Sequence, residues 1–303
     1  MTTTGCKRLP VLVPLLLAWT LCLGQQAPGS RHEEMVVDAV ARTYELYVPP
    51  GAGTEAGAAG LPLLVVLHGR GGSGAGIAAA SGFNELAQAV VVYPDGLGAQ
   101  WNYLAGIGAN QGVDDVRFLH ALVERMSDSL AIDPDRVYVA GYSNGGFMVQ
   151  RLACESDSPF RAFASVAGAG FEGLPMACEQ ARPLSMMLVH GTADQVVPWA
   201  GQTGVFGGRE IVLSASVPQT FGFWANQAGC GGASERNTVE LDGTNVERVE
   251  VLKVTDCPAG NEVVLYALVG GDHDWLRLVG NGEARMGFDV SREILGFFGV
   301  ELR

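Results

Sequence analysis

The stretch Arg136–Gly146, RVYVAGYSNGG, decides the fold of this chain. Its first half is a short apolar run, which is typical of a strand that is buried on both faces. Its second half fits the pattern G-x-S-x-G at Gly141–Gly145, and a segment with helical spacing follows from Asn144 to about Cys154. The glycines lack the Cβ atoms that would collide in a sharp turn. The sequence therefore predicts a strand, a tight turn that presents Ser143, and a helix.

Near-continuous apolar runs recur along the chain, and each ends in Gly, Pro or Asp. They cover Leu63–Leu67, Val90–Tyr93, Val137–Ala140, Ala162–Val166, Ser185–Val189 and Val263–Leu268. Helical segments separate them, at 116–130 after a cap at Asp114 or Asp115, after Asn144, at about 218–227 and at about 289–298. This alternation predicts an α/β fold, a mostly parallel, doubly wound sheet with helices on both faces. Alternation at Met35–Val40 and Tyr44–Val48 predicts an opening antiparallel hairpin.

The first 24 residues resemble a secretory signal peptide. Lys7 and Arg8 precede an apolar run at Val11–Leu23, and Cys22-Leu23-Gly24 offers a cleavage site. At about 1.5 Å per residue the run spans about 20 Å, less than the roughly 30 Å of a bilayer core. We therefore expect a signal peptide at 1–24, one catalytic domain at 25–303 and a secreted protein. A periplasmic location or a lipid anchor on Cys22 is the alternative.

Composition excludes several classes of protein. Apolar residues make up 48% of the 303 residues and charged residues 17%, which is unlike a disordered chain. Acidic residues outnumber basic ones by 32 to 19, so the formal charge is −13. Such a chain repels phosphate backbones and anionic lipid, so we expect neither nucleic acid nor membrane as a partner. The sequence does not indicate an oligomeric state.

Four cysteines remain after residue 24, namely Cys154, Cys178, Cys230 and Cys257. Four cysteines allow three pairings, and we expect the two that are local in sequence, 154 with 178 and 230 with 257. Disulfides agree with an oxidising compartment. No C-x-x-C or H-x-x-x-H spacing accompanies these cysteines, so the sequence predicts no metal.

Ser143 needs a base, and only His190 and His273 follow it in the sequence. Asp194 lies just after the predicted strand 185–189, and His273 follows the predicted strand 263–268. Parallel strands bring their carboxyl ends to one edge of the sheet, where such folds place their reactive groups. We predict Ser143 as nucleophile, Asp194 as acid and His273 as base, with His190 packing locally.

A glycine-rich loop, His68–Gly72, follows the strand Leu63–Leu67. One backbone N–H of this loop and the N–H of Asn144 are expected to stabilise a developing oxyanion. A phosphate cradle is the alternative, but the Lys-Ser/Thr pair of a P-loop is absent from the loop.

Together these motifs resemble the secreted polyhydroxybutyrate-depolymerase-like and feruloyl or acetylxylan esterases, carbohydrate esterase family 1 of the α/β-hydrolases. The matching stretches are Arg42–Pro50 (RTYELYVPP), Leu63–Gly72 (LLVVLHGRGG), Val92–Gly96 (VYPDG), Trp101-Asn102, Ile132–Gly146, Arg151–Cys154 (RLAC), His190–Pro198 (HGTADQVVP), Cys230 and Gly270–Trp275. The resemblance implies the triad Ser143, Asp194 and His273, with Arg70 as the first oxyanion donor. The family's GGGHxWP differs here at Asp272 and Leu276.

Three tryptophans, Trp101, Trp199 and Trp275, lie in or beside these motif loops. They are candidates for apolar walls around an acyl chain or an aromatic acid, and ordinary packing is the alternative.

The sequence thus predicts a cofactor-free, secreted serine carboxylesterase that works through an acyl-enzyme. Its expected substrates are feruloyl or acetyl esters of plant polysaccharides, or polyhydroxyalkanoate polyesters. A serine peptidase on the same fold is one alternative, although no accessory domain that would filter peptides is visible in the sequence. A non-catalytic surface binding protein is another, although such proteins typically lose a triad residue.

Overall fold

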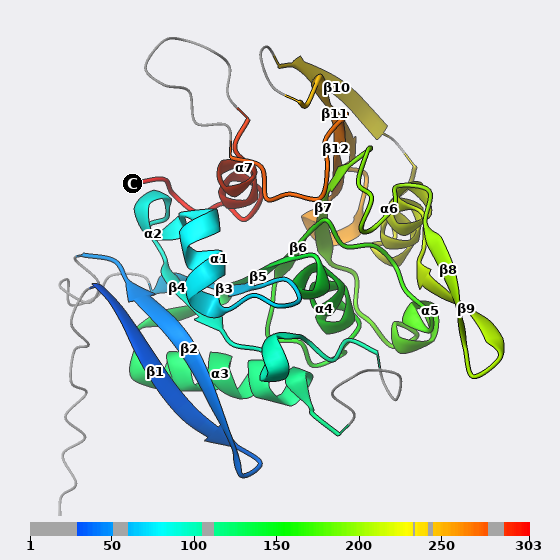
Figure 1. The fold of residues 1–303 in the computed structure, drawn as a ribbon. Coiled ribbons are helices and arrows are strands. Elements are labelled where there is room, and N and C mark those ends of the chain that lie inside the picture. Colours follow the sequence, from blue (N-terminus) through cyan, green and yellow to red (C-terminus); the bar gives the residue numbers. More distant parts are fainter. Residues whose placement is uncertain (1–28, 51–59, 105–111, 233, 242–244, 278–287) are drawn as a thin grey trace, which may run out of the picture.

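The computed structural model describes residues 29–50, 60–104, 112–232, 234–241, 245–277 and 288–303. The expected signal peptide, 1–24, lies outside these ranges. A ten-stranded sheet has the order β1-β2-β4-β3-β5-β6-β7-β12-β11-β10. Its central strands run parallel to one another (Figure 1). They are β4 (Val90–Pro94), β3 (Leu61–Leu67), β5 (Ile132–Tyr142), β6 (Ala162–Val166), β7 (Ser185–Gly191) and β12 (Val263–Val269). The predicted fold class is confirmed.

An antiparallel hairpin forms each edge of this sheet. One consists of β1 (Gly29–Val37) and β2 (Val40–Val48), the other of β10 (Ser234–Glu240) and β11 (Arg248–Val254). The first hairpin turns at Asp38-Ala39. The first strand therefore ends at Val37, and Val40, which was predicted to end it, is the first residue of β2. Both turn residues have positive φ, 50° and 65°, as a two-residue hairpin turn requires. Alanine gives no sequence signal for such a turn.

Helices cover both faces of the sheet (Figure 1). The helices α3 (Asp115–Ser129), α4 (Asn144–Ala153) and α6 (Val217–Gln227) pack into one apolar core, and α1 (Gly74–Ser81), α2 (Phe83–Leu86) and α7 (Val290–Phe297) pack into the other. The remaining elements are the short α5 (Leu174–Ala177), the 3₁₀ turns η1 (Leu97–Ala99) and η2 (Pro258–Gly260), and a separate two-stranded sheet of β8 (Gln202–Phe206) and β9 (Arg209–Ser214).

The two cores explain why the strand sequences are apolar without alternation. In β3, Leu63 and Val65 face the core that holds α3 and α4, whereas Leu64 and Val66 face the core that holds α1 and α7. All four side chains are fully buried. The carboxyl ends of β3, β5, β7 and β12 then lead into the loops that carry the predicted reactive residues.

Candidate active site

Ser143 occupies a strained turn between β5 and α4. Its φ is 53° and its ψ is −116°, values that cost a residue with a Cβ about 1–3 kcal/mol. A Cβ on Gly141 would collide with the carbonyl of Gly145, and a Cβ on Gly145 would collide with the carbonyl of Leu67. Only glycine fits either position. The N–H of Ser143 donates to the carbonyl of Val166 (2.8 Å), which fixes the turn against β6.

The structure brings the three predicted residues into one hydrogen-bonded row. His273 Nε2 lies 2.9 Å from Ser143 Oγ, and His273 Nδ1 lies 2.7 Å from Asp194 Oδ2. An ionised carboxylate accepts only, so Nδ1–H donates to Asp194 and Nε2 is left to accept from the serine hydroxyl. The side chain of Asp194 is fully buried, whereas 12% of the His273 side chain is exposed. This is the geometry of a nucleophile, a base and a buried orienting acid.

Asp194 is stabilised as an anion from four directions. Its Oδ1 accepts from the N–H groups of Val196 and Val197, both at 2.8 Å. Its Oδ2 lies 2.7 Å from His273 Nδ1 and 3.3 Å from His190 Nε2. Burial opposes ionisation, but the hydrogen bonds from His190, His273 and the two backbone groups outweigh it and hold the pKa of Asp194 well below its ordinary value.

His190 is more than a packing residue. It lies in β7, is buried, and packs edge-on against Trp199. A carbonyl only accepts, so the 2.8 Å contact to Val197 O shows that Nε2 carries the proton. The same N–H points toward Asp194 Oδ2. Sequence analysis predicted the local packing but missed the contact with Asp194.

The glycine-rich loop after β3 lies against Ser143. A Cβ on Gly69 would lie 3.4 Å from the Cβ of Ser143, and Arg70 follows with an exposed side chain. Asn144 is the first residue of α4, where a backbone N–H has no acceptor within the helix. The N–H of Gly71 donates to Ala99 O (2.7 Å) and ties the loop to η1. These positions suit the two expected oxyanion donors, Arg70 and Asn144.

His68 holds this loop through its two ring nitrogens. The N–H of Gly96 donates to His68 Nε2 (3.0 Å), so the proton of the neutral ring lies on Nδ1, which donates to Gly69 O (2.7 Å). Burial lowers the pKa of His68 and favours the neutral ring that this arrangement needs. His68 thereby connects the turn at Gly96 with the loop beside Ser143.

Trp101 links the two halves of the expected oxyanion site. Its N–H donates to Asn144 Oδ1 (2.6 Å), its carbonyl accepts from Asn144 Nδ2 (3.2 Å), and its indole N–H donates to His68 O (2.9 Å). The ring is 3% exposed and packs in the core. The interpretation of Trp101 as a substrate wall is therefore corrected, because the indole is enclosed and holds backbone instead.

A buried ion pair anchors the chain next to Trp101. Arg42 of β2 and Asp115 of α3 approach to 2.7 Å with side chains 3% and 0% exposed. Asp115 Oδ2 also accepts from the N–H of Asn102 (2.8 Å), and the guanidinium lies 3.7 Å from the centroid of the Phe118 ring. Asp115 thus fixes the loop from which Trp101 reaches Asn144.

The other two tryptophans differ. Trp275 is 6% exposed, donates its indole N–H to Ser291 Oγ (2.9 Å) and meets Phe83 edge-on, so it belongs to the core under α2 and α7. Its interpretation as a substrate wall is corrected for that reason. Trp199 is only partly buried beside His190 and stays a candidate wall.

Tyr142 is a further residue of the site that sequence analysis missed. Its hydroxyl donates to the backbone carbonyl of His273 (2.9 Å), and its ring lies 5.2 Å from the imidazole. Burial raises the pKa of this phenol to about 12, so the hydroxyl keeps its proton. The variable position of the G-x-S-x-G pattern therefore holds the histidine loop, and nothing in the sequence signals this contact.

Two cysteine pairs cross-link the fold. The structure joins Cys154 to Cys178 and Cys230 to Cys257, with Cα atoms 4.3 Å and 3.9 Å apart.

In the described ranges, no three His, Cys, Asp or Glu residues gather to hold a metal. Within the same ranges, no helix has the length and apolar character to cross a membrane.

Comparisons with known proteins find esterases among the relatives of this chain. The chain is 32% identical over 266 residues to "Putative esterase NocK" of Nocardia uniformis subsp. tsuyamanensis, covering 80% of this chain and 73% of that protein. It is also 32% identical over 209 residues to feruloyl esterase C of Emericella nidulans, covering 63% of this chain and 72% of that protein. The chain belongs to the family of these esterases. As a member of these esterases, it is a carboxylic ester hydrolase.

Two further comparisons concern the fold of this esterase. The solved acetyl xylan esterase from Aspergillus awamori superposes with a TM-score of 0.60 at 16% identity, over 89% of this chain and 99% of that one. A family model described as the prolyl oligopeptidase family matches residues 83–170, the segment that contains Ser143. Both matches agree with an α/β-hydrolase fold.

Proposed function

We propose that Ser143, Asp194 and His273 form the catalytic triad of this esterase and that hydrolysis proceeds through an acyl-enzyme. The observation that carries the proposal is the row of hydrogen bonds from Asp194 through His273 to Ser143 Oγ, at 2.7 and 2.9 Å. The strained turn that presents Ser143 and the fully buried carboxylate of Asp194 support the same assignment.

In the first half-reaction, His273 Nε2 takes the proton of Ser143 as Oγ attacks the ester carbonyl. The negative charge that develops on the carbonyl oxygen is stabilised by the N–H groups of Arg70 and Asn144. His273 then returns the proton to the leaving alkoxide, which departs as the alcohol and leaves an acyl group on Oγ. Asp194 stays ionised and stabilises the charged imidazolium.

In the second half-reaction, water attacks the acyl-enzyme and His273 takes its proton. Collapse of the tetrahedral intermediate breaks the acyl–Oγ bond, and Oγ recovers a proton from His273. The products are the carboxylic acid and free enzyme, and neither a cofactor nor a metal enters the sequence of steps.

For substrates, we propose feruloyl or acetyl esters of plant polysaccharides, with polyhydroxyalkanoate-type polyesters as the second class. The name of the Emericella relative supports the first choice. Rates on methyl ferulate, acetylated xylan and a hydroxybutyrate oligomer, compared with Ser143→Ala, test it. The peptidase alternative draws on the family match over 83–170, so a proline-containing peptide amide belongs in the same panel. Cleavage of the peptide and of no ester would favour that alternative.

Labelling with a fluorophosphonate tests the acyl-enzyme mechanism. Because the probe traps an activated serine, we expect one label per chain on Ser143 and none on Ser143→Ala. A chain that is not labelled would instead favour the non-catalytic binding alternative.

We also propose secretion, with a signal peptide at 1–24 followed by one catalytic domain at 25–303. The two disulfides and the sequence of residues 1–24 support this. Exported protein should begin near Gln25, carry no free thiol, and yield non-reduced peptides that link Cys154 to Cys178 and Cys230 to Cys257. Four free thiols in exported material would refute both the pairing and the compartment.

A further inference from the structure

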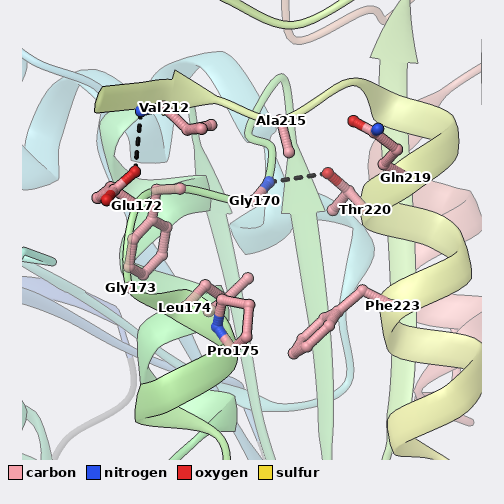
Figure 2. Close-up of a pocket in the computed structure, with 11 residues that line it drawn as sticks. Gly170, Glu172, Gly173, Leu174, Pro175, Val212, Ala215, Gln219, Thr220 and Phe223 are labelled. Carbon is pink, nitrogen blue, oxygen red and sulfur yellow. Dashed lines mark hydrogen bonds between the residues drawn. The ribbon is translucent and has the colours of Figure 1, made fainter. Parts of the chain in front are cut away.

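A pocket separate from the triad lies where α5, β9 and α6 meet. Its volume is about 380 Å³, within the roughly 300–1,000 Å³ of small-molecule sites. Figure 2 shows Phe223 of α6 pointing across it toward Leu174 and Pro175 of α5, with Val212 and Ala215 from the β9 segment above. Phe171 completes the apolar lining.

Two polar side chains at this pocket, those of Glu172 and Thr220, are already paired within the protein. Glu172 accepts from Arg209 (2.8 Å) and from the N–H of Val212 (2.9 Å). Thr220 Oγ1 accepts from the N–H of Gly170 and donates to Ser216 O, both at 2.9 Å. A charged ligand would lose its hydration here without gaining a free partner of opposite charge, so the lining favours an uncharged apolar group.

Aromatic side chains connect this pocket to the candidate active site. Phe171 meets Tyr103 edge-on at 5.0 Å, and Tyr103 stacks on Phe147 at 4.9 Å. Phe147 lies on the first turn of α4, where its N–H donates to the carbonyl of Ser143 (3.0 Å). An unbroken row of rings therefore runs from the helix that begins beside Ser143 to the wall of the pocket.

Apolar surface also surrounds the pocket. Val212 is 37% exposed, and Leu213, which follows it on β9, and Met176 on α5 are exposed as well. Uncovered apolar side chains that gather beside a concave site are typical of a binding surface.

We infer that this pocket binds an uncharged aryl group of the ester substrate, remote from the scissile bond. Phe171 and Phe223 offer aromatic contacts, and Leu174, Pro175 and Val212 offer aliphatic ones, a lining that suits a flat ring. The inference rests on the proposed function and adds a specificity site to it.

The test compares three esters. Methyl ferulate carries its ring on the acyl side, 2-phenylethyl acetate carries it on the alcohol side, and ethyl acetate carries none. Val212→Asp places a carboxylate in the pocket wall, and we expect kcat/KM to fall about tenfold or more on at least one aryl ester. The rate on ethyl acetate should stay unchanged, and the aryl ester that responds identifies the side of the ester bond that the pocket serves.

Val205→Asp is the matched control, because Val205 is exposed on the paired strand and does not line the pocket. Phe223→Leu is a second variant, which removes a ring but keeps an apolar wall, and it should lower the same rate by a smaller factor. Thermal melts establish that each variant is folded.

Three results would overturn the inference. Rates on both aryl esters that stay unchanged in Val212→Asp and Phe223→Leu would do so, as would an equal loss on all three esters. A wild-type protein that cleaves ethyl acetate but neither aryl ester would overturn it as well. A wild-type protein that cleaves none of these three esters, and neither acetylated xylan nor a hydroxybutyrate oligomer, would overturn the proposed function itself, and the two failures are therefore distinguishable.

Discussion

Trp101 and Asn144, 43 residues apart, pair as two strands of a sheet would, through one donated and one accepted hydrogen bond. Asn144 thus uses its side chain to hold a loop while its backbone N–H stays available at the start of α4. The same residue therefore holds the Trp101 loop and carries one of the two expected oxyanion donors.

Asn144→Ala removes both bonds and leaves the buried N–H and C=O of Trp101 unpaired, at a cost of about 1–3 kcal/mol of stability. We expect kcat to fall by about tenfold or more with little change in KM, because the support of the oxyanion site is lost while substrate contacts remain. Steady-state kinetics on an ester measures both. Trp101→Phe keeps the backbone pairing and loses only the indole bond to His68, so its kcat should fall less. An unchanged kcat in Asn144→Ala would contradict this account.

Ser143→Ala should abolish most esterase activity while leaving a residual rate about 10³–10⁴ above that of water, if the precedent of serine proteases applies. The structure contributes the reason for the expected intact fold, since Ser143 is only partly buried. Hydrolysis of a chromogenic ester at high enzyme concentration measures the activity that remains. A rate within tenfold of the wild type would remove Ser143 from the mechanism.

Backbone strain at Ser143 predicts that glycine at this position stabilises the fold more than alanine does. Glycine adopts a φ of 53° without the steric cost that a Cβ imposes. Ser143→Gly should therefore be more stable than Ser143→Ala by about 1 kcal/mol, although glycine normally weakens a fold relative to alanine. Urea unfolding of the two inactive variants measures the difference. An alanine variant that is the more stable of the two would mean that the turn is relaxed.

The depressed pKa of Asp194 predicts how stability changes in acid. A carboxylate whose folded pKa lies below its unfolded value of about 3.9 stabilises the fold above that value. The stabilisation is lost as the pH falls from there through the folded pKa. The advantage of the wild type over Asp194→Asn in the free energy of unfolding should thus shrink between about pH 5 and pH 2.5. Urea unfolding at several pH values tests this, and a constant advantage over that range would contradict it.

The disulfide between Cys154 and Cys178 joins the last turn of α4 to the end of α5. Replacing both cysteines by alanine should cost about 3 kcal/mol of stability, because the unfolded chain regains the freedom of the closed loop. The double variant at Cys230 and Cys257 is matched in loop length, 27 residues against 24, and should lose a similar amount. The first should also alter rates on aryl esters, since Cys178 ends α5 and α5 lines the pocket. Equal stability of variants and wild type would refute the prediction.

The sequence predicted the parallel strands and the larger helices because their signals are local. β5 and β12 carry apolar residues on both faces, and α3 has an amphipathic pattern with a cap at Asp114. It did not predict β10, whose side chains are largely exposed and polar, so that only pairing with β11 makes it a strand. The helix α1, GAGIAAAS, has two glycines in its first turn, which weaken the helical signal, and it begins at a cap by Ser73.

The candidate triad was predictable for a different reason. Ser143, Asp194 and His273 each follow a buried strand, and parallel pairing places those strand ends together whatever the loops do. The supporting contacts depend on loop conformation and not on strand order. The bonds of Tyr142 to the His273 carbonyl and of Trp101 to Asn144 cross 131 and 43 residues, and no periodicity encodes them.

The hairpin β8–β9 forms a sheet of its own and pairs with none of the ten main strands. Its exposed residues can therefore be exchanged without shifting the register that holds Ser143, Asp194 and His273 in line, whereas Ile211 and Ser214 are buried and hold the hairpin to the fold. In this chain, substrate preference can change at the hairpin while the chemistry at Ser143 stays the same. A library of variants at the exposed positions of residues 202–214, screened on different esters, would test for new substrate preferences at little risk to folding.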